Sequence, residues 1–180
     1  MIRTCTIRGK ILLDTYGNWI KKEDGVLDIG CGNGIIAKTI QEKYNCNIQG
    51  TDILDFLSFK IPFKLMKNET TLPYDNQEFD IALLNDILHH TRKQEEVLKE
   101  ALRVSKKVII FETKPTLRAK ILDHVLNWGH NVNMPIPLTH KTPEQWSKLF
   151  QKINIKYEYR EAKSSMIYPL SHFCFILTDD

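Results

Sequence analysis

The chain has 180 residues, of which 42% are hydrophobic and 26% are charged, and its formal net charge is +3. This composition is ordinary for a soluble globular protein, and the length suits a single domain over residues 1–180 and is too short for a second full one. No apolar run approaches the length of a membrane span, and the charge is too weak to indicate nucleic-acid binding by itself.

The four cysteines, Cys5, Cys31, Cys46 and Cys174, are expected to be free thiols. None of them forms a C-x-x-C pair or a Cys/His cluster of the zinc type, and the scattered histidines lack spaced carboxylate or cysteine partners, so no metal site is predicted. The first ten residues lack the apolar core of a secretory signal. We therefore expect a cytoplasmic protein in a reducing compartment.

The first predicted element is a helix near the N-terminus. Apolar and aromatic residues recur at helical spacing from Ile11 to Ile20, and the pattern stops before Asp24. The spacing predicts a helix that packs on a sheet.

Residues 26–34, with the sequence V-L-D-I-G-C-G-N-G, join a buried strand to a glycine turn. Gly30, Gly32 and Gly34 allow positive φ angles and a close approach of the backbone to a ligand. A helix predicted over about 35–44 would point its free N–H groups at the same ligand. Three glycines and an acid exceed what a turn without a ligand needs, so the segment predicts a binding site.

The carboxylate of Asp28 indicates which cofactor this turn binds. The spacing G-x-G-x-G differs from the dinucleotide fingerprint G-x-G-x-x-G, and an acid before the turn would repel a pyrophosphate. Both features disfavour a nicotinamide oxidoreductase. S-adenosylmethionine suits the site, because it carries sulfonium and ammonium charges and no phosphate.

The segment resembles motif I of the class I S-adenosylmethionine-dependent methyltransferases, with matches at Asp28, Gly30, Gly32 and Gly34. Within that family the chain looks like the small-molecule subgroup of type 11 and of ubiquinone and menaquinone biosynthesis. The resemblance implies S-adenosylmethionine as the cofactor and S-adenosylhomocysteine as the product. Cys31 is expected to contribute mainly its backbone N–H to the site.

A short strand over 47–51 ends at Asp52, which lies 18 residues beyond Gly34. An acid at about this distance meets the ribose hydroxyls in nucleotide-binding α/β units, because the second strand ends at the same edge as the first. We predict Asp52 as the ribose acceptor and include the next residue, Ile53, in the cofactor site. Lysines then alternate with apolar residues over 59–67, a pattern that favours a half-exposed strand over a phosphate-binding surface.

The loop over 68–80 again looks like the family, in which an acid in a Gly-Asp-Ala segment accepts a hydrogen bond from the adenine amino group. Asn68 occupies the place of that acid here, and its carbonyl oxygen can still accept. We therefore assign Asn68 to adenine recognition, with Glu69 as the alternative acceptor.

The predicted strand over 81–84 leads into Asn85, which we assign to the cofactor site, and then into a Leu-His-His segment common in the same subgroup. Thr91 and Gln94 are expected to form a capping box for a helix from about 92 to 104. A fifth strand over 107–111 ends at Glu112, at the edge where open α/β sheets bind ligands, so Glu112 is expected to face the substrate.

Methyl transfer from a sulfonium needs a base only when the attacking atom carries a proton. The candidates at the sheet edge are Asp86, His89, His90 and Glu112, and we prefer His90 because histidine accepts a proton near neutral pH. The other interpretation, a histidine that packs on adenine or caps the next helix, stays open.

Residues 114–150 form an insert between the fifth and sixth strands. The pattern predicts a helix over 117–128, a loop over 129–141 and a second capping box from Thr142 to Gln145, with Pro143 at the first helical position. Two strand-like runs follow, over 153–159 and 172–177. The resemblance implies a Rossmann-like three-layer α/β sandwich whose seven-stranded sheet is mostly parallel, with the last strand antiparallel.

The methyl acceptor is predicted from the aromatic and amide residues expected to cover the site. These are Tyr16, Trp19, Trp128, His130, Asn131 and Met134. They suit a small, partly apolar organic molecule. Two alternatives stay open: a methyltransferase for tRNA, another nucleic acid or a protein, and a module that binds S-adenosylmethionine without catalysis.

Overall fold

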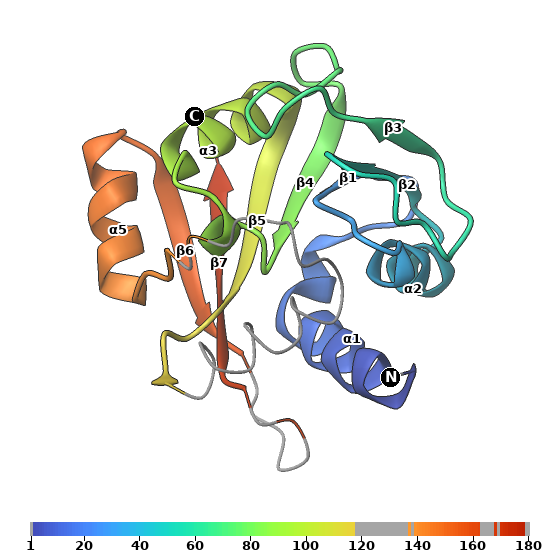
Figure 1. Ribbon diagram of the computed structural model, residues 1–180, viewed down its shortest axis with the longest axis horizontal. Coiled ribbons are helices and arrows are strands. Elements are labelled where there is room, and N and C mark those ends of the chain that lie inside the picture. Colours follow the sequence, from blue (N-terminus) through green and yellow to red (C-terminus); the bar gives the residue numbers. More distant parts are fainter. Residues whose placement is uncertain (1, 118–136, 138, 163–167, 169, 179–180) are drawn as a thin grey trace.

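The computed structural model describes residues 2–117, 137, 139–162, 168 and 170–178, with side chains from residue 7 onwards. Seven strands form one sheet (Figure 1). The strands are β1 (Gly25–Ile29), β2 (Asn47–Asp52), β3 (Phe63–Leu65), β4 (Phe79–Asn85), β5 (Ser105–Thr113), β6 (Lys156–Glu161) and β7 (His172–Thr178). The helices are α1 (Ile2–Tyr16), α2 (Ile35–Tyr44), α3 (Gln94–Val104) and α5 (Pro143–Lys152), with the short 3-10 helices η1 (Gly17–Trp19) and η2 (Leu88–His90).

The strand order is β3-β2-β1-β4-β5-β7-β6. The first five strands are parallel, and β7 runs antiparallel to both of its neighbours, β5 and β6. The seven-stranded, mostly parallel sheet predicted from the sequence is thereby confirmed. We call the edge at which β1, β2, β4 and β5 end the carboxyl edge, because parallel strands bring their last residues together there.

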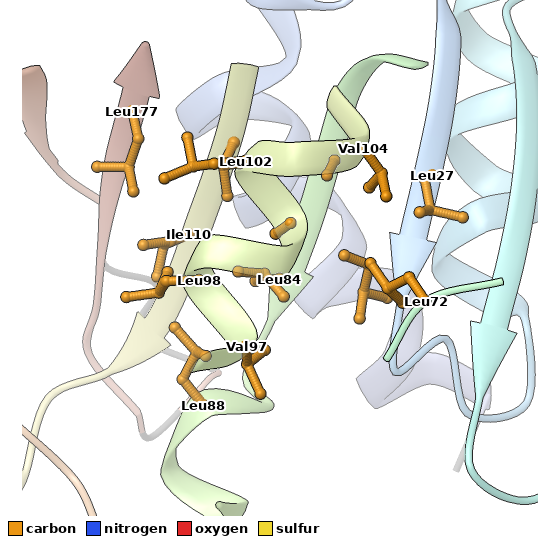
Figure 2. Close-up of a cluster of buried hydrophobic side chains, with 14 of the residues drawn as sticks. Leu27, Leu72, Leu84, Leu88, Val97, Leu98, Leu102, Val104, Ile110 and Leu177 are labelled. Atoms are coloured by element: carbon orange, nitrogen blue, oxygen red, sulfur yellow. The ribbon is translucent and has the colours of Figure 1, made fainter. Parts of the chain in front are cut away.

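Helices cover both faces of the sheet and give three layers. In β4, Ile81 and Leu83 join a core cluster with α1 and α2, whereas Ala82 and Leu84 join a cluster with α3 and α5. The strand is buried on both faces, which explains its continuous apolar sequence. Figure 2 shows the second cluster, in which Leu98 of α3 packs against the sheet.

The start of α3 differs from the prediction. The expected capping box of Thr91 and Gln94 is wrong, because the helix begins at Gln94 with Lys93 at its N-cap and without a side-chain cap. The Thr91 hydroxyl accepts from the Lys93 amide instead. The Gln94 side chain donates to the carbonyl oxygens of Leu88 and Thr139 and thus ties η2 to the segment before α5. The second predicted box, Thr142 with Gln145 and Pro143, is confirmed at α5.

Other predicted segments have mixed outcomes. The strand expected in the lysine-rich stretch is present only as the three residues of β3, at one end of the sheet. The helix predicted over 117–128, except for its first residue, and most of the following loop lie outside the described residues. Cys31, Cys46 and Cys174 are free and buried. In the part of the chain that the structure describes, no helix has both the length and the apolar character of a membrane span.

Candidate cofactor and active site

The glycine turn between β1 and α2 lies at the carboxyl edge and has the predicted backbone conformation. The φ angles of Gly30, Gly32 and Gly34 are 70°, 53° and 79°. A Cβ atom added to Gly30 would lie 2.6 Å from Cγ2 of Ile87, whereas one added to Gly32 would have no described heavy atom within 4 Å. Gly30 is therefore needed for internal packing, and Gly32 borders open space that a ligand can enter.

The ribose candidate Asp52 is joined to this turn by a hydrogen bond. Its Oδ2 atom accepts from the backbone N–H of Gly32 at 2.9 Å, and its Oδ1 atom accepts from the Ile53 amide at 2.7 Å. The predicted strand end and the predicted turn thus form one unit. The Ile53 side chain is 38% exposed, and apolar side chains at Leu54 and Phe56 are exposed close by in the sequence. This apolar surface next to an acid suits a nucleoside.

Asp28 lies below the turn with a side chain that is only 2% exposed. Its Oδ1 atom accepts a hydrogen bond of 3.2 Å from Nδ2 of Asn85, which ends the neighbouring strand β4. Burial raises the pKa of Asp28 to about 7, although the Asn85 hydrogen bond and the charge of Arg8 act in the opposite direction. A cation bound nearby would favour the ionised carboxylate.

Asn85 also links the site to α1. Its Oδ1 atom accepts from the Tyr16 hydroxyl at 2.8 Å, so a chain of hydrogen bonds runs from Tyr16 through Asn85 to Asp28. Tyr16 is fully buried, and this burial raises its pKa well above the usual value. The expectation that Tyr16 covers the acceptor was wrong, because its hydroxyl supports Asn85 from within the core.

Trp19, the other aromatic residue expected over the site, lies elsewhere. It lines a groove with Lys107, Lys156 and Thr178. Thr178, at the end of β7, pairs with Lys107 near the start of β5 and with Lys156 at the start of β6. This groove is at the opposite edge of the sheet from the glycine turn. Trp19 therefore does not cover the cofactor, and the residues of the insert expected to do so, from Trp128 to Met134, lie outside the described residues.

The adenine candidates Asn68 and Glu69 already have partners within the chain. Oδ1 of Asn68 accepts from both the amide and the hydroxyl of Thr70, at 2.9 and 3.1 Å. Glu69 forms an exposed ion pair of 3.4 Å with Lys93. Their role in adenine recognition stays a prediction, and for Asn68 it requires sharing an oxygen that already accepts two hydrogen bonds.

Glu112, near the end of β5, and His89 of η2 form a buried pair. Oε2 of Glu112 lies 2.6 Å from Nδ1 of His89, and each side chain is 2% exposed. Oε1 of Glu112 accepts from the Leu88 amide at 2.8 Å. The rings of His90 and His140 lie 4.1 and 4.3 Å from the His89 ring, and His140 is stacked on it. Glu112 thus contacts a histidine in the core rather than pointing outward, and that histidine is His89, not the preferred His90.

Asp86 forms a second charged group at the same edge. Its φ of 53° is unusual for a non-glycine residue, and its carboxylate lies 3.0 Å from Arg8 and 3.2 Å from His172. The Thr113 hydroxyl donates to its other oxygen at 2.9 Å. Burial alone would raise the pKa of Asp86, but the charges of His172 and Arg8 outweigh burial and hold the pKa well below its usual range.

Asp86, His89 and Glu112 bring possible metal-ligand atoms within 4.8 Å of one another. Both carboxylates, however, already accept hydrogen bonds or ion pairs from protein donors, and the guanidinium of Arg8 adjoins Asp86. A second cation would be repelled by Arg8 and would have to displace these donors. The arrangement is therefore better described as a hydrogen-bonded network than as a metal centre.

Comparison with known proteins gives one family. The family described as "Methyltransferase domain" matches residues 8–159. A curated relative, the malonyl-[acyl-carrier protein] O-methyltransferase of Calditerrivibrio nitroreducens, is 27% identical over 111 residues, which are 60% of this chain and 45% of the relative. The chain thus matches less than half the length of that relative.

Solved structures of similar fold include a SAM-dependent methyltransferase from Archaeoglobus fulgidus, with a TM-score of 0.70 and 14% identity over 97% of this chain and 94% of that one. The geranyl diphosphate C-methyltransferase of Streptomyces coelicolor, solved with Mg2+, geranyl diphosphate and S-adenosyl-L-homocysteine, gives a TM-score of 0.67 at 10% identity, over 96% and 80% of the two chains. At these identities the likeness shows the fold alone, and it agrees with the architecture described above.

Proposed function

The chain belongs to the methyltransferase domain family, and from this premise we propose that it transfers a methyl group from S-adenosylmethionine to a small organic molecule. This family membership confirms the prediction from motif I of a class I S-adenosylmethionine-dependent methyltransferase. It also confirms the predicted cofactor, S-adenosylmethionine. The proposal therefore concerns the reaction, the acceptor and the residues that serve them.

The observation that carries the proposal is the hydrogen bond between Asp52 and the Gly32 amide. It joins an acid suited to ribose hydroxyls to a turn that borders open space, with the exposed side chain of Ile53 alongside. The buried carboxylate of Asp28, which a bound cation would hold in its ionised form, would repel a phosphate. This donor set fits an adenosyl cofactor without phosphates.

In this proposal Asp52 holds the ribose and Ile53 packs on the adenine. The glycine turn, including the Cys31 backbone, holds the amino-acid part of the cofactor together with Asp28 and Asn85. The cofactor supplies a methyl group that is already activated by the sulfonium charge. The protein's main task is then to align the acceptor with that methyl group and to exclude water.

A small acceptor is supported by two similar proteins. The curated relative is named for a malonyl group on a carrier protein, and one solved neighbour is named for geranyl diphosphate. The weak net charge of +3 gives no sign of a nucleic-acid surface. Methylation of RNA or protein, and cofactor binding without catalysis, are the outcomes that the experiments below would reveal instead.

Calorimetric titration with S-adenosylhomocysteine tests the cofactor site. Asp52→Ala should weaken binding by about 10- to 100-fold, because the ribose loses a charged acceptor and the turn loses its support. Asp14→Ala, an exposed aspartate of α1, is the matched control and should bind as the wild type does. Failure of the wild type to bind either S-adenosylhomocysteine or S-adenosylmethionine below millimolar concentrations would remove the proposal.

The acceptor class is tested by incubating the protein with S-adenosylmethionine labelled in the methyl group and with separated metabolite, RNA and protein fractions of a cell extract. Label in a metabolite is the expected result. Label in RNA or protein would replace the small-molecule proposal, and cofactor binding with no transfer to any fraction would favour the non-catalytic module.

A further inference from the structure

Strand β6 ends the sheet on the side opposite β3, and among the described residues β7 is the only strand that pairs with it (Figure 1). In an antiparallel pair, the backbone groups of successive residues point to alternate sides of the strand. The Ala162 amide donates to the carbonyl oxygen of His172, which continues the register of β6 and β7. The backbone N–H and C=O groups of Tyr157, Tyr159 and Glu161 therefore point away from β7, to the outer edge of the sheet.

The side chains of β6 carry both signs of charge. Glu158 and Arg160 lie on the face that holds Trp19, because the Arg160 guanidinium stacks on the Trp19 ring at 3.5 Å, and the two charged groups form an ion pair of 3.0 Å. Tyr159 lies on the other face, where its ring contacts Phe175 and is 41% exposed. Edge strands that resist self-association use a proline, a bulge or charges that repel a second copy. The sequence K-Y-E-Y-R-E of β6 has no proline, and its charges alternate in sign.

These charges distinguish the ways in which two copies of β6 can pair. Antiparallel pairing at the outer edge requires that residues with outward-pointing backbone groups lie opposite one another. When Tyr159 lies opposite Tyr159 of the second copy, Glu158 of each copy lies opposite Arg160 of the other. A shift by two residues places Glu158 opposite itself in one direction and Arg160 opposite itself in the other. Opposite charges stabilise such cross-strand pairs and like charges destabilise them, so the sequence of β6 favours one register.

We propose that this chain forms a symmetric dimer through the outer edge of β6, with the two-fold axis at Tyr159 and the two sheets joined into one. A two-fold axis makes every contact occur twice, so Glu158 and Arg160 of both copies form one group of alternating charges across the axis. The Tyr159 rings meet on the other face and bury aromatic surface that is exposed in the single chain. The contact is confined to one strand edge and is small, so the dimer dissociates at micromolar concentration.

Sedimentation velocity of the full chain tests the dimer. The mass of the wild type should rise from that of one chain towards that of two as the concentration increases from low to high micromolar. Glu158→Arg brings like charges together across the axis, as does Arg160→Glu, so each variant alone should stay monomeric. A wild type that remains monomeric over this range would overturn the inference, and so would a single variant that dimerises as the wild type does.

A mixture of the two variants tests the register. The Glu158→Arg chain is positive at both positions and the Arg160→Glu chain is negative at both, so every pair across the axis joins opposite charges. The mixture should dimerise although neither variant does so alone, which would also show that both are folded. The double variant Glu158→Arg/Arg160→Glu, in which the charges are exchanged, should dimerise by itself. A mixture and a double variant that both remain monomeric would contradict the register.

Tyr159→Pro tests the backbone contacts. It removes an N–H that points outward, and the ladder between β6 and β7 keeps its hydrogen bonds. This variant should be monomeric and should bind S-adenosylhomocysteine as the wild type does, because β5 and β7 separate β6 from the cofactor strands β1 and β4. Glu96→Arg, at an exposed glutamate of α3, is the control and should dimerise normally. Dimerisation of Tyr159→Pro at the wild-type concentration would contradict the inference. A wild type that dimerises without binding S-adenosylhomocysteine would remove only the proposed function.

Discussion

The side-chain amide of Asn85 and the carboxylate of Asp28 are joined by a 3.2 Å hydrogen bond between the parallel strands β4 and β1. The same amide accepts from Tyr16 on α1, so one residue supports the acid of motif I and fixes the helix that covers this face. Mutations at Asp28 and Tyr16 can therefore test the ionisation of Asp28 and the contribution of the α1 contact separately.

Asp28→Asn should change how stability depends on pH. Burial raises the pKa of Asp28 to about 7, so the folded protein keeps a proton that the unfolded chain releases near pH 4. The contribution of the Asp28 proton to the free energy of unfolding of the wild type is fully present below pH 4 and is lost as the pH rises towards 7. The asparagine variant lacks this loss, so its free energy of unfolding relative to the wild type should rise by up to about 4 kcal/mol between pH 4 and pH 8.

Urea unfolding at pH 4, 6 and 8 measures this difference. Asp14→Asn is the control, since this aspartate is exposed on α1. A difference between Asp28→Asn and the wild type that stays constant over the three pH values would contradict a raised pKa.

Two glycine substitutions in the same turn should have different effects. Gly30→Ala places a methyl group 2.6 Å from Ile87 at a φ of 70°, and about 2–4 kcal/mol of stability should be lost. Gly32→Ala meets no described atom within 4 Å, so only the conformational cost of about 1–2 kcal/mol is expected. Its affinity for S-adenosylhomocysteine should fall at least 10-fold, because the methyl group enters the ligand's space. Thermal unfolding of both variants and their titration with S-adenosylhomocysteine measure these effects. Normal affinity in a folded Gly32→Ala variant would show that the ligand does not contact this position.

Tyr16→Phe should cost about 1–2 kcal/mol of folding free energy, because the buried Oδ1 atom of Asn85 loses its donor. Tyr159→Phe on β6 is a matched control, since that ring is 41% exposed. Urea unfolding of the two variants gives the comparison. Equal stabilities of Tyr16→Phe and the wild type would show that the hydrogen bond from the Tyr16 hydroxyl makes no net contribution to the free energy of folding.

Arg8→Met should remove the hydrogen bond from the guanidinium to the main-chain oxygen of Asn85 and the ion pair with Asp86. Asp86 would keep its contacts with His172 and Thr113. The expected loss is roughly 2–4 kcal/mol at pH 7. Because Arg8 and His172 hold the pKa of Asp86 below its usual range, the stability they provide is present above pH 4 and is lost as the pH falls below it. The difference from the wild type should therefore shrink at pH 3, and the exposed Arg92→Met should show neither effect.

The strand, turn and first helix of the cofactor site were predictable because their signals are local. Glycine spacing, an apolar run and an acid at a set distance lie within residues 26–52, and the structure places these elements within one or two residues of the predicted bounds. The strands β4, β5 and β7 were equally predictable, because they are almost entirely buried and each contains a run of apolar residues.

Features that depend on the packing of distant segments were not predictable. His89 and His90 are neighbours in one short turn, and only the position of Glu112 on β5 decides which of them receives a carboxylate. Tyr16 was expected near the acceptor, but its hydroxyl is buried and donates to Asn85 at the end of β4. The sequence distances of these contacts, 23 and 69 residues, explain why no local pattern reveals them.

The placement of β7 between β5 and β6 has a consequence for biosynthesis. On the ribosome, β1 to β5 can pair as they emerge, and motif I can assemble with them. The strand β7, which pairs with both β5 and β6, is translated after them. The pairing of β6 and of the free side of β5 is therefore possible only after residues 172–178 have been made. The cofactor half of the sheet can thus form during translation, while the rest is completed only when the final strand inserts between its two neighbours.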